Sequence, residues 1–295
     1  MALLRKGRQF LKYVIHGFFT SSCYHGRSHF TTLSIVNDNY NGVTVNCDML
    51  PQSISGNKFK QILSDSLVEW ERKHSAVWLN IPISYSSLIP EAVELGFQFH
   101  HAEGNSCTMT RWLDKTAESQ LPMFASHQVG VAGCVLNDKN EVLVVQEKKM
   151  RLPIWKFPGG LSNLGEDIGK TAEREVFEET GVETEFKSII CFRQQHTHPG
   201  AFGRSDLFFL CRMKALTENI RPCPREIRAC QWMDIQSFSE QPNGPALLKR
   251  FSSLIEYGLH EGFHKIDLQY TEFQSIYKGL KYKMFHANLP ENWKQ

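Results

Sequence analysis

Residues 160–182 read GLSNLGEDIGKTAEREVFEETGV and contain a cluster of acidic side chains at helical spacing. Glu175, Glu178 and Glu179 stand at positions i, i+3 and i+4, so an α-helix would place their carboxylates on one face. Like charges this close repel one another unless a cation lies among them. Carboxylate oxygens are hard ligands that favour Mg²⁺ or Mn²⁺, so the spacing predicts a divalent-metal site.

The same helix has an apolar strip beside the acidic face. Ala172, Val176 and Thr180 recur every four residues, turned by about 100° from the carboxylates. Gly181 follows at the position where a left-handed residue commonly ends a helix. The sequence therefore predicts a helix that is anchored on a sheet by one face and presents acids on the next.

A glutamate-rich helix usually presents these residues to solvent and has no further function. Here the complete motif of residues 160–182 favours a functional interpretation. Residues 160–182 resemble the Nudix box and fill every defined position of this signature of the Nudix hydrolase superfamily. The resemblance covers roughly residues 128–262. It implies a metal site that includes the Gly160 carbonyl, an Arg174 that orients a glutamate, and a supporting carboxylate at Glu166.

The implied reaction is the attack of a metal-activated water on one phosphorus of a nucleoside diphosphate linked to another group. The general base remains open at this stage. Within the box it is Glu178 or Glu175, and outside the box Glu218, Glu226 and Glu240 are alternatives that the sequence does not distinguish.

A polar segment after the box is the main candidate for substrate binding. Residues 193–207 read RQQHTHPGAFGRSDL and are expected to join two strands. Phe202 is suited to stacking on a base and Arg204 to contacting phosphate or ribose, and we add Arg193 and Asp206 to this set. The alternative is an ordinary polar hairpin loop.

Other residues near these motifs have either a functional or a purely structural role. Trp155, which precedes the box, is either a packing residue or a ligand-stacking residue, and the same choice applies to Trp232. His196 and His198 have no further metal-ligating partners in the sequence, so we do not expect them to form a metal site.

Three features together resemble one branch of the superfamily: WKFPGG at 155–160, RQQH and FGRSDLFF within 193–209, and a βαβαβ domain in front. This branch contains the animal Nudix protein encoded antisense to basic fibroblast growth factor and the plant ADP-ribose/NADH pyrophosphatases. The resemblance spans about residues 42–293 and implies ADP-ribose or NAD(H) as the substrate and AMP as a product. The extended SQPWPFPxS-type signature of the dedicated NADH pyrophosphatases is absent from the sequence, and so is the coenzyme A signature. The alternatives are an mRNA decapping hydrolase and a weakly active nucleotide- or RNA-binding regulator of cell proliferation.

The expected fold class is α+β, with strands and helices mixed in one chain. We expect four parts: a basic leader at 1–36, a small βαβαβ pre-Nudix domain at 37–120, a Nudix α/β/α sandwich at 121–262, and a helical C-terminal extension at 263–295. Within the last part, a helix is expected over residues 271–285.

The leader is basic and amphipathic. The first acidic residue is Asp38, and five Arg or Lys residues precede it among apolar side chains. This composition is typical of a mitochondrial transit peptide. The alternative is an irregular basic start on a protein of the cytoplasm or nucleus.

The amino-acid composition of the chain argues against some classes of binding partner. A net charge of +2 is too small to indicate bulk binding to nucleic acid or membrane. The eight cysteines lack CxxC spacing, which favours reduced thiols over a zinc or disulfide framework, and no apolar run reaches the roughly 20 residues of a membrane span. We expect a small-molecule nucleotide substrate and no membrane, with RNA and a second copy of the chain as further candidate partners.

Overall fold

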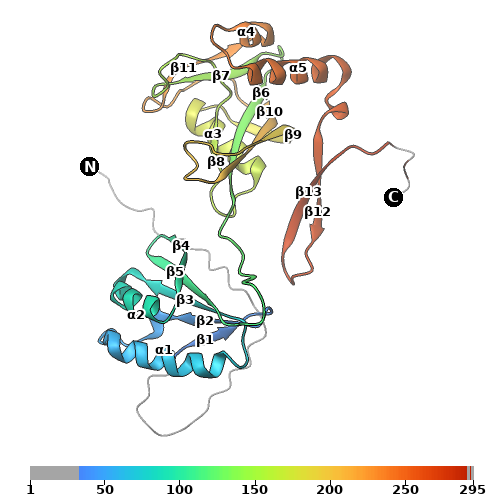
Figure 1. The fold of residues 1–295 in the computed structure, drawn as a ribbon. Helices are drawn as coiled ribbons and strands as arrows, with labels where there is room; N and C mark the ends of the chain where they lie inside the picture. Colours follow the sequence, from blue (N-terminus) through green and yellow to red (C-terminus); the bar gives the residue numbers. More distant parts are fainter. Residues whose placement is uncertain (1–32, 291–292, 294–295) are drawn as a thin grey trace. The chain divides into compact units, whose positions relative to one another are not determined.

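The structure is a computed structural model that describes residues 33–290 and Trp293. Its contacts divide the described residues into two compact units, with the division between residues 124 and 125 (Figure 1). The predicted transit peptide lies almost entirely outside the described residues.

The first unit contains a five-stranded sheet and two α-helices. Its strand order is β1-β2-β3-β5-β4, with β2 and β3 parallel and the other pairs antiparallel. The expected βαβαβ order is present, with β1 added in front. The elements are β1 (Ile35–Asn37), β2 (Gly42–Asn46), α1 (Gly56–Trp70), β3 (Ala76–Pro82), α2 (Ile89–Glu94), β4 (Gln98–Glu103) and β5 (Ser106–Trp112).

Helix α1 forms because its start is capped and its apolar residues share one face. The Ser55 hydroxyl accepts a hydrogen bond from the Lys58 N–H, which satisfies one of the unpaired donors of the first turn. Phe59 and Leu63 on this helix are fully buried, and they pack in one cluster with Leu79 of β3. The first unit therefore has its own hydrophobic core.

The second unit is built around a larger mixed sheet with strand order β11-β7-β6-β10-β9-β12-β13. Strands β6 and β10 are parallel, and the other neighbours are antiparallel. The elements are β6 (His127–Leu136), β7 (Val142–Glu147), β8 (Gly159–Leu161), α3 (Ile168–Thr180), β9 (Thr184–Gln195), β10 (Ser205–Ala215), β11 (Ile227–Met233), α4 (Ile235–Glu240), α5 (Ala246–Glu261), β12 (Leu268–Gln274) and β13 (Lys281–Ala287).

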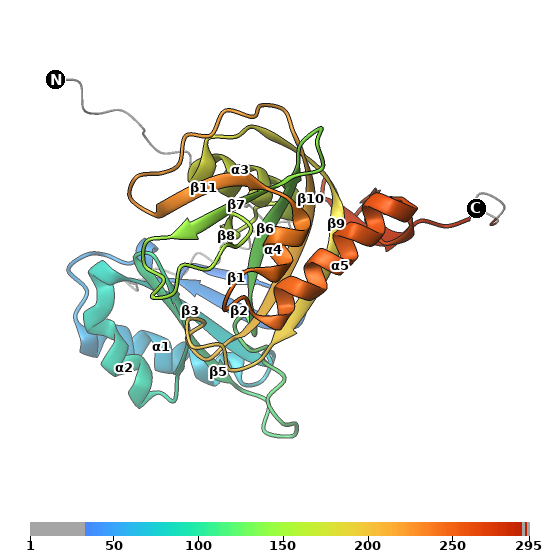
Figure 2. The ribbon, with the colours of Figure 1, turned by 90° about the horizontal axis from the view of Figure 1, so that it is seen from above.

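Helices cover both faces of this sheet, as expected for an α/β/α sandwich (Figure 2). On one face, Val176 of α3 packs with Val131 of β6. On the other face, Phe251 of α5 and Phe238 of α4 pack with Ala132, the next residue along β6. Because side chains alternate along a strand, β6 contributes to both hydrophobic layers and is buried throughout its centre.

Strands β6 and β7 diverge soon after their connecting turn, and this opening receives the start of the box. They pair with each other through Leu136 and Val142. Beyond that point, Lys156 forms a bridge with β7, and β8 pairs with β6. The segment from Lys156 to Leu161 therefore runs between the two diverging strands. The expected hairpin exists, but it is open at the end that holds the box.

The predicted C-terminal helix at 271–285 is wrong. The structure has the antiparallel hairpin β12–β13 there, and β12 joins the main sheet where Leu268 pairs with Ile189 of β9. Both strands contain aromatic residues, which favour extended structure, and Gly279 adopts a φ of 82° in the turn. The extension is thus part of the second unit and is not a helical addition to it.

The cysteines and the helices of the described residues can be examined in the same way. Seven cysteines lie in the described part of the chain, and all of them are free thiols. Among the helices of that part, none has the length and apolarity needed to cross a bilayer.

The contact between β6 and α3 predicts a stability effect at Gly133. A Cβ there would lie 2.5 Å from Cγ2 of Val176, so Gly133→Ala should lower the free energy of unfolding by about 1–3 kcal/mol through overpacking. Gly200→Ala is the matched control, because its Cβ would lie no closer than 3.5 Å to another side chain. Urea denaturation of both variants provides the measurement, and equal midpoints for the two would contradict this packing.

Candidate functional site

Helix α3 holds the acidic residues of the box. Gly181 ends the helix with a φ of 74°, and its N–H bonds to the Phe177 carbonyl. The exposure of the three carboxylate residues differs along the face: Glu178 is exposed, Glu175 is half-buried, and Glu179 is buried. One helix face therefore offers carboxylates in three environments.

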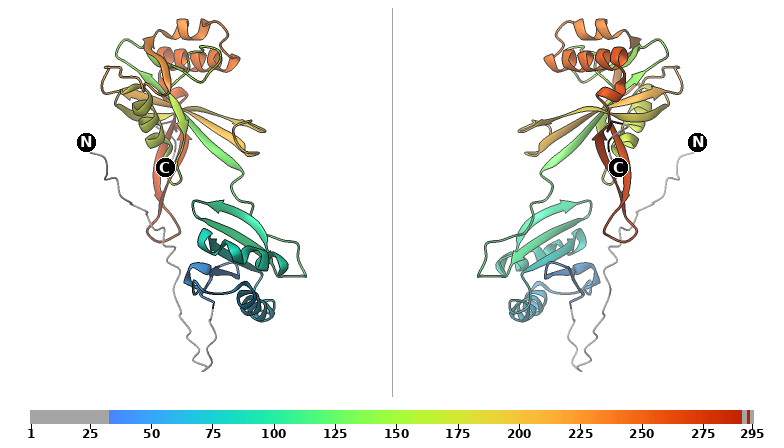
Figure 3. Two further views of the ribbon diagram at one scale, coloured as in Figure 1. Left: turned by 90° about the vertical axis from the view of Figure 1, so that its left-hand side faces the viewer. Right: turned by 90° about the vertical axis from the view of Figure 1, so that its right-hand side faces the viewer.

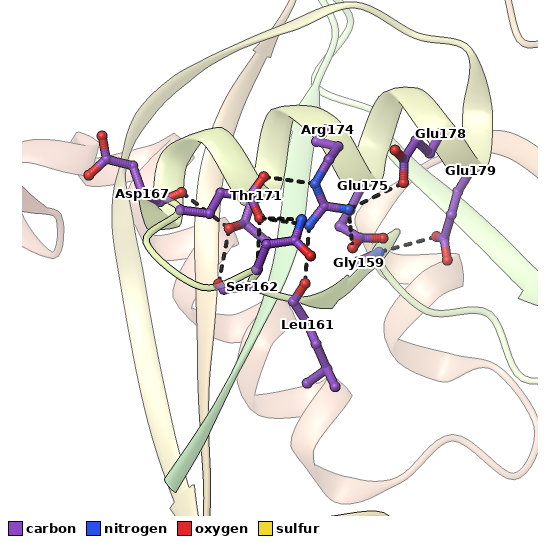
Figure 4. Close-up of polar contacts among 11 residues, drawn as sticks. Gly159, Leu161, Ser162, Asp167, Thr171, Arg174, Glu175, Glu178 and Glu179 are labelled. Atoms are coloured by element: carbon purple, nitrogen blue, oxygen red, sulfur yellow. Dashed lines mark hydrogen bonds and ion pairs between the residues drawn. The ribbon is translucent and has the colours of Figure 1, made fainter. Parts of the chain in front are cut away.

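Arg174 connects these acids to the loop that precedes the helix (Figure 4). Its Nε and Nη2 atoms donate to the two oxygens of Glu166 at 2.7 and 2.8 Å. Its Nη1 atom donates to Glu175 at 2.6 Å and to Glu178 at 3.2 Å, and Nη2 also reaches the Leu161 carbonyl at 3.1 Å. These five contacts match the five N–H groups of a guanidinium. Arg174 thus orients two box carboxylates and is itself held by a third.

Glu166 is the anchor of this arrangement. The Arg174 guanidinium lowers the pKa of the Glu166 carboxyl to about 2, and the Asn163 N–H contributes a further hydrogen bond at 2.9 Å. A carboxylate that accepts a two-pronged hydrogen bond from arginine is fixed in both position and plane. Glu166 therefore remains ionised and holds the loop against the helix.

The pKa of Glu179 is shifted in the opposite direction to that of Glu166. Burial raises its pKa to about 7; the nearby Lys156 opposes this rise, whereas Glu147 and Glu175 add to it. One of its oxygens accepts a hydrogen bond from the Gly159 N–H at 3.1 Å. A buried carboxylate with acidic neighbours is a group whose charge would be stabilised by an added cation.

Gly160 brings the backbone against the acids. A Cβ at this position would lie 2.7 Å from the Glu175 carboxyl carbon and from both of its oxygens, so a larger residue would disturb the contact. The glycine places a main-chain segment, including its carbonyl, beside the carboxylate face of α3. The role of the Gly160 carbonyl as a metal ligand stays a prediction.

The donor set fits a hard divalent cation. Glu175, Glu178 and Glu179, together with the Gly160 carbonyl, supply the oxygen atoms that Mg²⁺ and Mn²⁺ prefer. Among the residues described by the structure, no three His, Cys, Asp or Glu side chains are already gathered as a coordination group. Glu175 and Glu178 both accept hydrogen bonds from Arg174.

Two residues near Glu179 were missed by the sequence analysis. Lys156 and Glu147 form an ion pair, and both act on the pKa of Glu179. Glu147 ends β7, and Lys156 pairs with Val145 of the same strand, so their approach depends on the opening between β6 and β7. The sequence signal was limited to the position of Lys156 just before the box.

The predicted base candidates outside the box have contacts elsewhere. Among the described contacts, the Glu240 carboxylate pairs with Gln236. The main-chain carbonyls of Glu218 and Glu226 accept hydrogen bonds from Trp232 and Lys148. None of these three residues shares a described contact with the carboxylates of α3.

Two of the predicted substrate residues form a polar network. Arg193 forms an ion pair with Asp206 at 3.2 Å, and Gln128 donates a hydrogen bond to the other oxygen of Asp206 at 2.8 Å. Asp206 is 3% exposed, and the Arg193 guanidinium lies over the Phe208 ring. The Arg193 Nε atom is buried and has no hydrogen-bond partner. A buried donor of this kind is costly unless something else pairs with it.

This network lies next to the box in the sheet register. Gln128 of β6 pairs with Asp206 of β10, and Gly130, two residues along β6, pairs with Leu161 of β8. The Ser162 N–H bonds to the Val129 carbonyl in between. Strand β6 therefore links the network to the loop that follows Gly160.

The loop between β9 and β10 presents Phe202 and Arg204. Phe202 is 98% exposed, and its φ of 49° is rare for a bulky residue. In the same loop, His196 forms a hydrogen bond with Ser205, and His198 accepts one from the Gly200 N–H.

The backbone of Trp155 is bonded to the side chain of Gln241. The Gln241 side chain accepts from the Trp155 N–H at 2.7 Å and donates to its carbonyl at 3.0 Å. The Trp155 side chain is half-buried against the core, which favours the packing interpretation over ligand stacking. Trp232 is also half-buried in the core, so the same interpretation applies.

Comparison with known proteins agrees with this geometry. Residues 126–254 match the family model described as NUDIX domain, and residues 33–113 match the model described as Nudix hydrolase domain. The chain is 45% identical to Nucleoside diphosphate-linked moiety X motif 6 of Homo sapiens, over 87% of this chain and 82% of the relative. It is 51% identical to the Xenopus laevis protein of the same name, over 70% of this chain and 96% of the relative.

A plant protein is also similar. Nudix hydrolase 8 of Arabidopsis thaliana is 44% identical over 76% of this chain and 61% of its own length. The complete box, the α/β/α sandwich around it and these long matches lead to one conclusion: the chain belongs to the Nudix hydrolase family.

Proposed function

We propose that the chain hydrolyses the pyrophosphate bond of ADP-ribose or NAD(H) and releases AMP. The observation that carries this proposal is the set of carboxylates on α3, two of which are fixed by Arg174. The name of the animal relatives, nucleoside diphosphate-linked moiety X motif 6, supports a substrate in which a nucleoside diphosphate is joined to another group. The choice of ADP-ribose or NAD(H) within this class rests on the branch resemblance.

Nudix hydrolases generally use divalent metal ions, and we propose Mg²⁺ or Mn²⁺ here. Glu175, Glu178, Glu179 and the Gly160 carbonyl are the groups that would hold it. When bound, the ion would neutralise charge on the phosphate oxygens and lower the pKa of a water molecule.

The remaining chemistry can be assigned to side chains. The carboxylate of Glu178 is 59% exposed, so it can meet an attacking water and accept its proton. Glu179 is buried and receives a hydrogen bond from Gly159, which suits it to holding charge in place. Arg174 donates one hydrogen bond to the Glu178 carboxylate at 3.2 Å, which helps to orient this carboxylate for proton transfer.

Substrate binding is proposed at the strand ends beside the box. The unpaired Nε of Arg193 is a donor for a phosphate or ribose oxygen. Phe202 offers an exposed ring for adenine, because a strained and solvated aromatic residue gains stability by stacking on a base. Arg204, in the same loop, is positioned in sequence to contact the phosphates.

The first experiment measures the products from ADP-ribose, NADH, NAD⁺, diadenosine polyphosphates and capped RNA with Mg²⁺ and with Mn²⁺. AMP from ADP-ribose or NADH is the expected result. A nucleoside diphosphate released from capped RNA would instead establish decapping. Metal binding without turnover of any substrate would support the regulatory-binding alternative.

Glu178→Gln should reduce kcat by about a thousandfold, because it removes the proton acceptor while keeping the size of the side chain. Steady-state kinetics on the best substrate of the panel measures this effect. Glu256→Gln is the matched control, since Glu256 is an exposed glutamate on α5. Full activity in Glu178→Gln would show that another residue acts as the general base.

Arg174→Lys should lower kcat about tenfold to a hundredfold and weaken Mn²⁺ binding by a similar factor. Lysine keeps the charge but cannot make the two-pronged contact with Glu166 while also holding Glu175 and Glu178. A titration with Mn²⁺ reports the second effect without any reaction. Arg228→Lys, at an exposed arginine on β11, should change neither quantity.

Phe202→Ala should raise KM about tenfold and leave kcat nearly unchanged, because stacking on the base contributes equally before and during the reaction. Phe202→Tyr should retain the wild-type KM. Tyr257→Ala, which removes a half-exposed aromatic side chain from α5, is the control for general effects. An unchanged KM in Phe202→Ala would exclude this residue from the site.

A further inference from the structure

The C-terminal hairpin β12–β13 lies against the start of helix α3. Figure 3 shows the hairpin projecting from the sheet, which β12 joins at Leu268. Tyr270 of β12 pairs with Phe285 of β13, and two residues further along, Glu272 pairs with Lys283. Because side chains alternate along a strand, these four residues share one face of the hairpin. This face is turned toward α3 and the loop that precedes it.

An aromatic contact joins the hairpin to α3 through Phe186 of β9. The ring centroids of Tyr270 and Phe285 each lie 6.4 Å from the ring centroid of Phe186. A Cβ at Gly169, in the first turn of α3, would lie 2.7 Å from the Cγ atom of Phe186, so the helix passes close to this ring. The Phe186 N–H also donates to the Glu173 carboxylate at 3.1 Å. Phe186 is therefore shared by the hairpin and the helix.

The packing around this ring is incomplete. A cavity of about 110 Å³ lies between the first turn of α3 and the hairpin, and Lys170, Phe186 and Lys283 are among the residues that line it. The apolar contact alone therefore leaves room for the start of the helix to shift against the hairpin. A direct polar contact between the two would limit such a shift.

Lys283 supplies a polar contact to the residue that precedes α3. Its Nζ atom donates to the Asp167 carboxylate at 2.8 Å and lies 4.9 Å from the centroid of the Tyr270 ring. Asp167 is the N-cap of α3, where a carboxylate commonly accepts a hydrogen bond from the first turn, but its side chain makes no such bond. The Asp167 carboxylate is thus directed to the hairpin and not to its own helix.

The loop that receives this contact consists of residues 162–167, which we call the box loop. It is open to solvent in its middle, where Leu164 is 88% exposed. Within the described part of the chain, Lys283 is the one side chain from outside residues 160–182 that has a hydrogen bond to the box loop. The other side-chain hydrogen bonds of the loop come from the box itself.

We propose that Lys283 is a positioning residue for the hydrolysis and acts through Asp167 on the acids of α3. Asp167 directly follows Glu166, and Glu166 holds the guanidinium of Arg174. Arg174 in turn donates to two glutamates of the box. The hairpin thereby fixes the catalytic arrangement from outside the motif. This inference rests on the proposed function, because those glutamates are the groups to which catalysis is assigned.

The ion pair is expected to affect the geometry of the site more than the stability of the fold. The Asp167 side chain is 54% exposed, and ion pairs at a protein surface contribute little to the free energy of unfolding. A displacement of about 1 Å in a catalytic group can nevertheless reduce a rate about a hundredfold. Because Lys283 acts through Asp167 and Glu166, we expect a smaller loss than this.

The test compares two lysines of the same hairpin. Lys283→Met keeps a long apolar side chain and removes the charge, so it should lower kcat about tenfold, leave KM nearly unchanged and weaken Mn²⁺ binding by a similar factor to kcat. Lys281→Met is the matched control, because Lys281 pairs with Glu272 of the hairpin at 2.6 Å. The control should change none of these quantities.

Hydrogen exchange of the metal-free protein gives a readout that does not depend on the reaction. The backbone amides of the box loop should exchange faster in Lys283→Met than in the wild type, and Lys281→Met should leave their rates unchanged. Unchanged loop exchange together with unchanged Mn²⁺ affinity in Lys283→Met would overturn the role of Lys283. Failure of the wild-type chain to release AMP would instead count against the proposed function, so the two outcomes are distinguishable.

A double-variant cycle tests the route through Asp167. Asp167→Asn removes the charge and keeps a residue suited to an N-cap. If Lys283 acts through Asp167, the double variant should lose no more Mn²⁺ affinity than Lys283→Met alone. Losses that multiply would show separate routes and overturn the proposal. Lys283→Arg keeps the charge and should bind Mn²⁺ as the wild type does; an arginine variant as impaired as the methionine variant would also contradict the proposal.

Discussion

The guanidinium of Arg174 is the contact on which the site depends. Glutamates three and four residues apart on a helix repel one another, and without a partner each would turn toward solvent in its own direction. Arg174 holds Glu175 and Glu178 together, and Glu166 holds Arg174 from the preceding loop. Loop, helix and acids are thus positioned by one side chain whose charge is permanent at any physiological pH.

The sheet contributes the second constraint, which is the opening between β6 and β7. This opening admits the backbone from Lys156 to Leu161, and it brings Gly160 against Glu175 and the Gly159 N–H against Glu179. The buried Glu179 and the exposed Glu178 then differ in character although they are adjacent in sequence. The opening between β6 and β7 and the face of α3 together create this difference, which neither element would produce alone.

The sequence predicted the parts of the structure that local rules determine. Helix α3, its apolar strip and its end at Gly181 follow from spacing and from the conformation that glycine allows. The approach of Glu147 and Lys156 to Glu179 depends on how far two strands diverge, so no spacing in the sequence encodes it. The segment 271–285 was mistaken for a helix because its aromatic residues at 273, 277 and 285 also fit helical spacing, whereas pairing across a turn decided the outcome.

The network of Arg193 with Asp206 shows how fold and specificity are linked in this chain. Both residues were singled out from sequence by their chemistry, but their shared position came from the antiparallel register of β9 and β10. Asp206 is buried and already accepts a hydrogen bond from Gln128, so it fixes Arg193 more than it offers itself to a ligand. The unpaired Nε of Arg193 is the atom left for recognition. We therefore propose that substrate choice is decided at the end of β9 and in the loop that carries Phe202, whereas the box supplies chemistry common to the family.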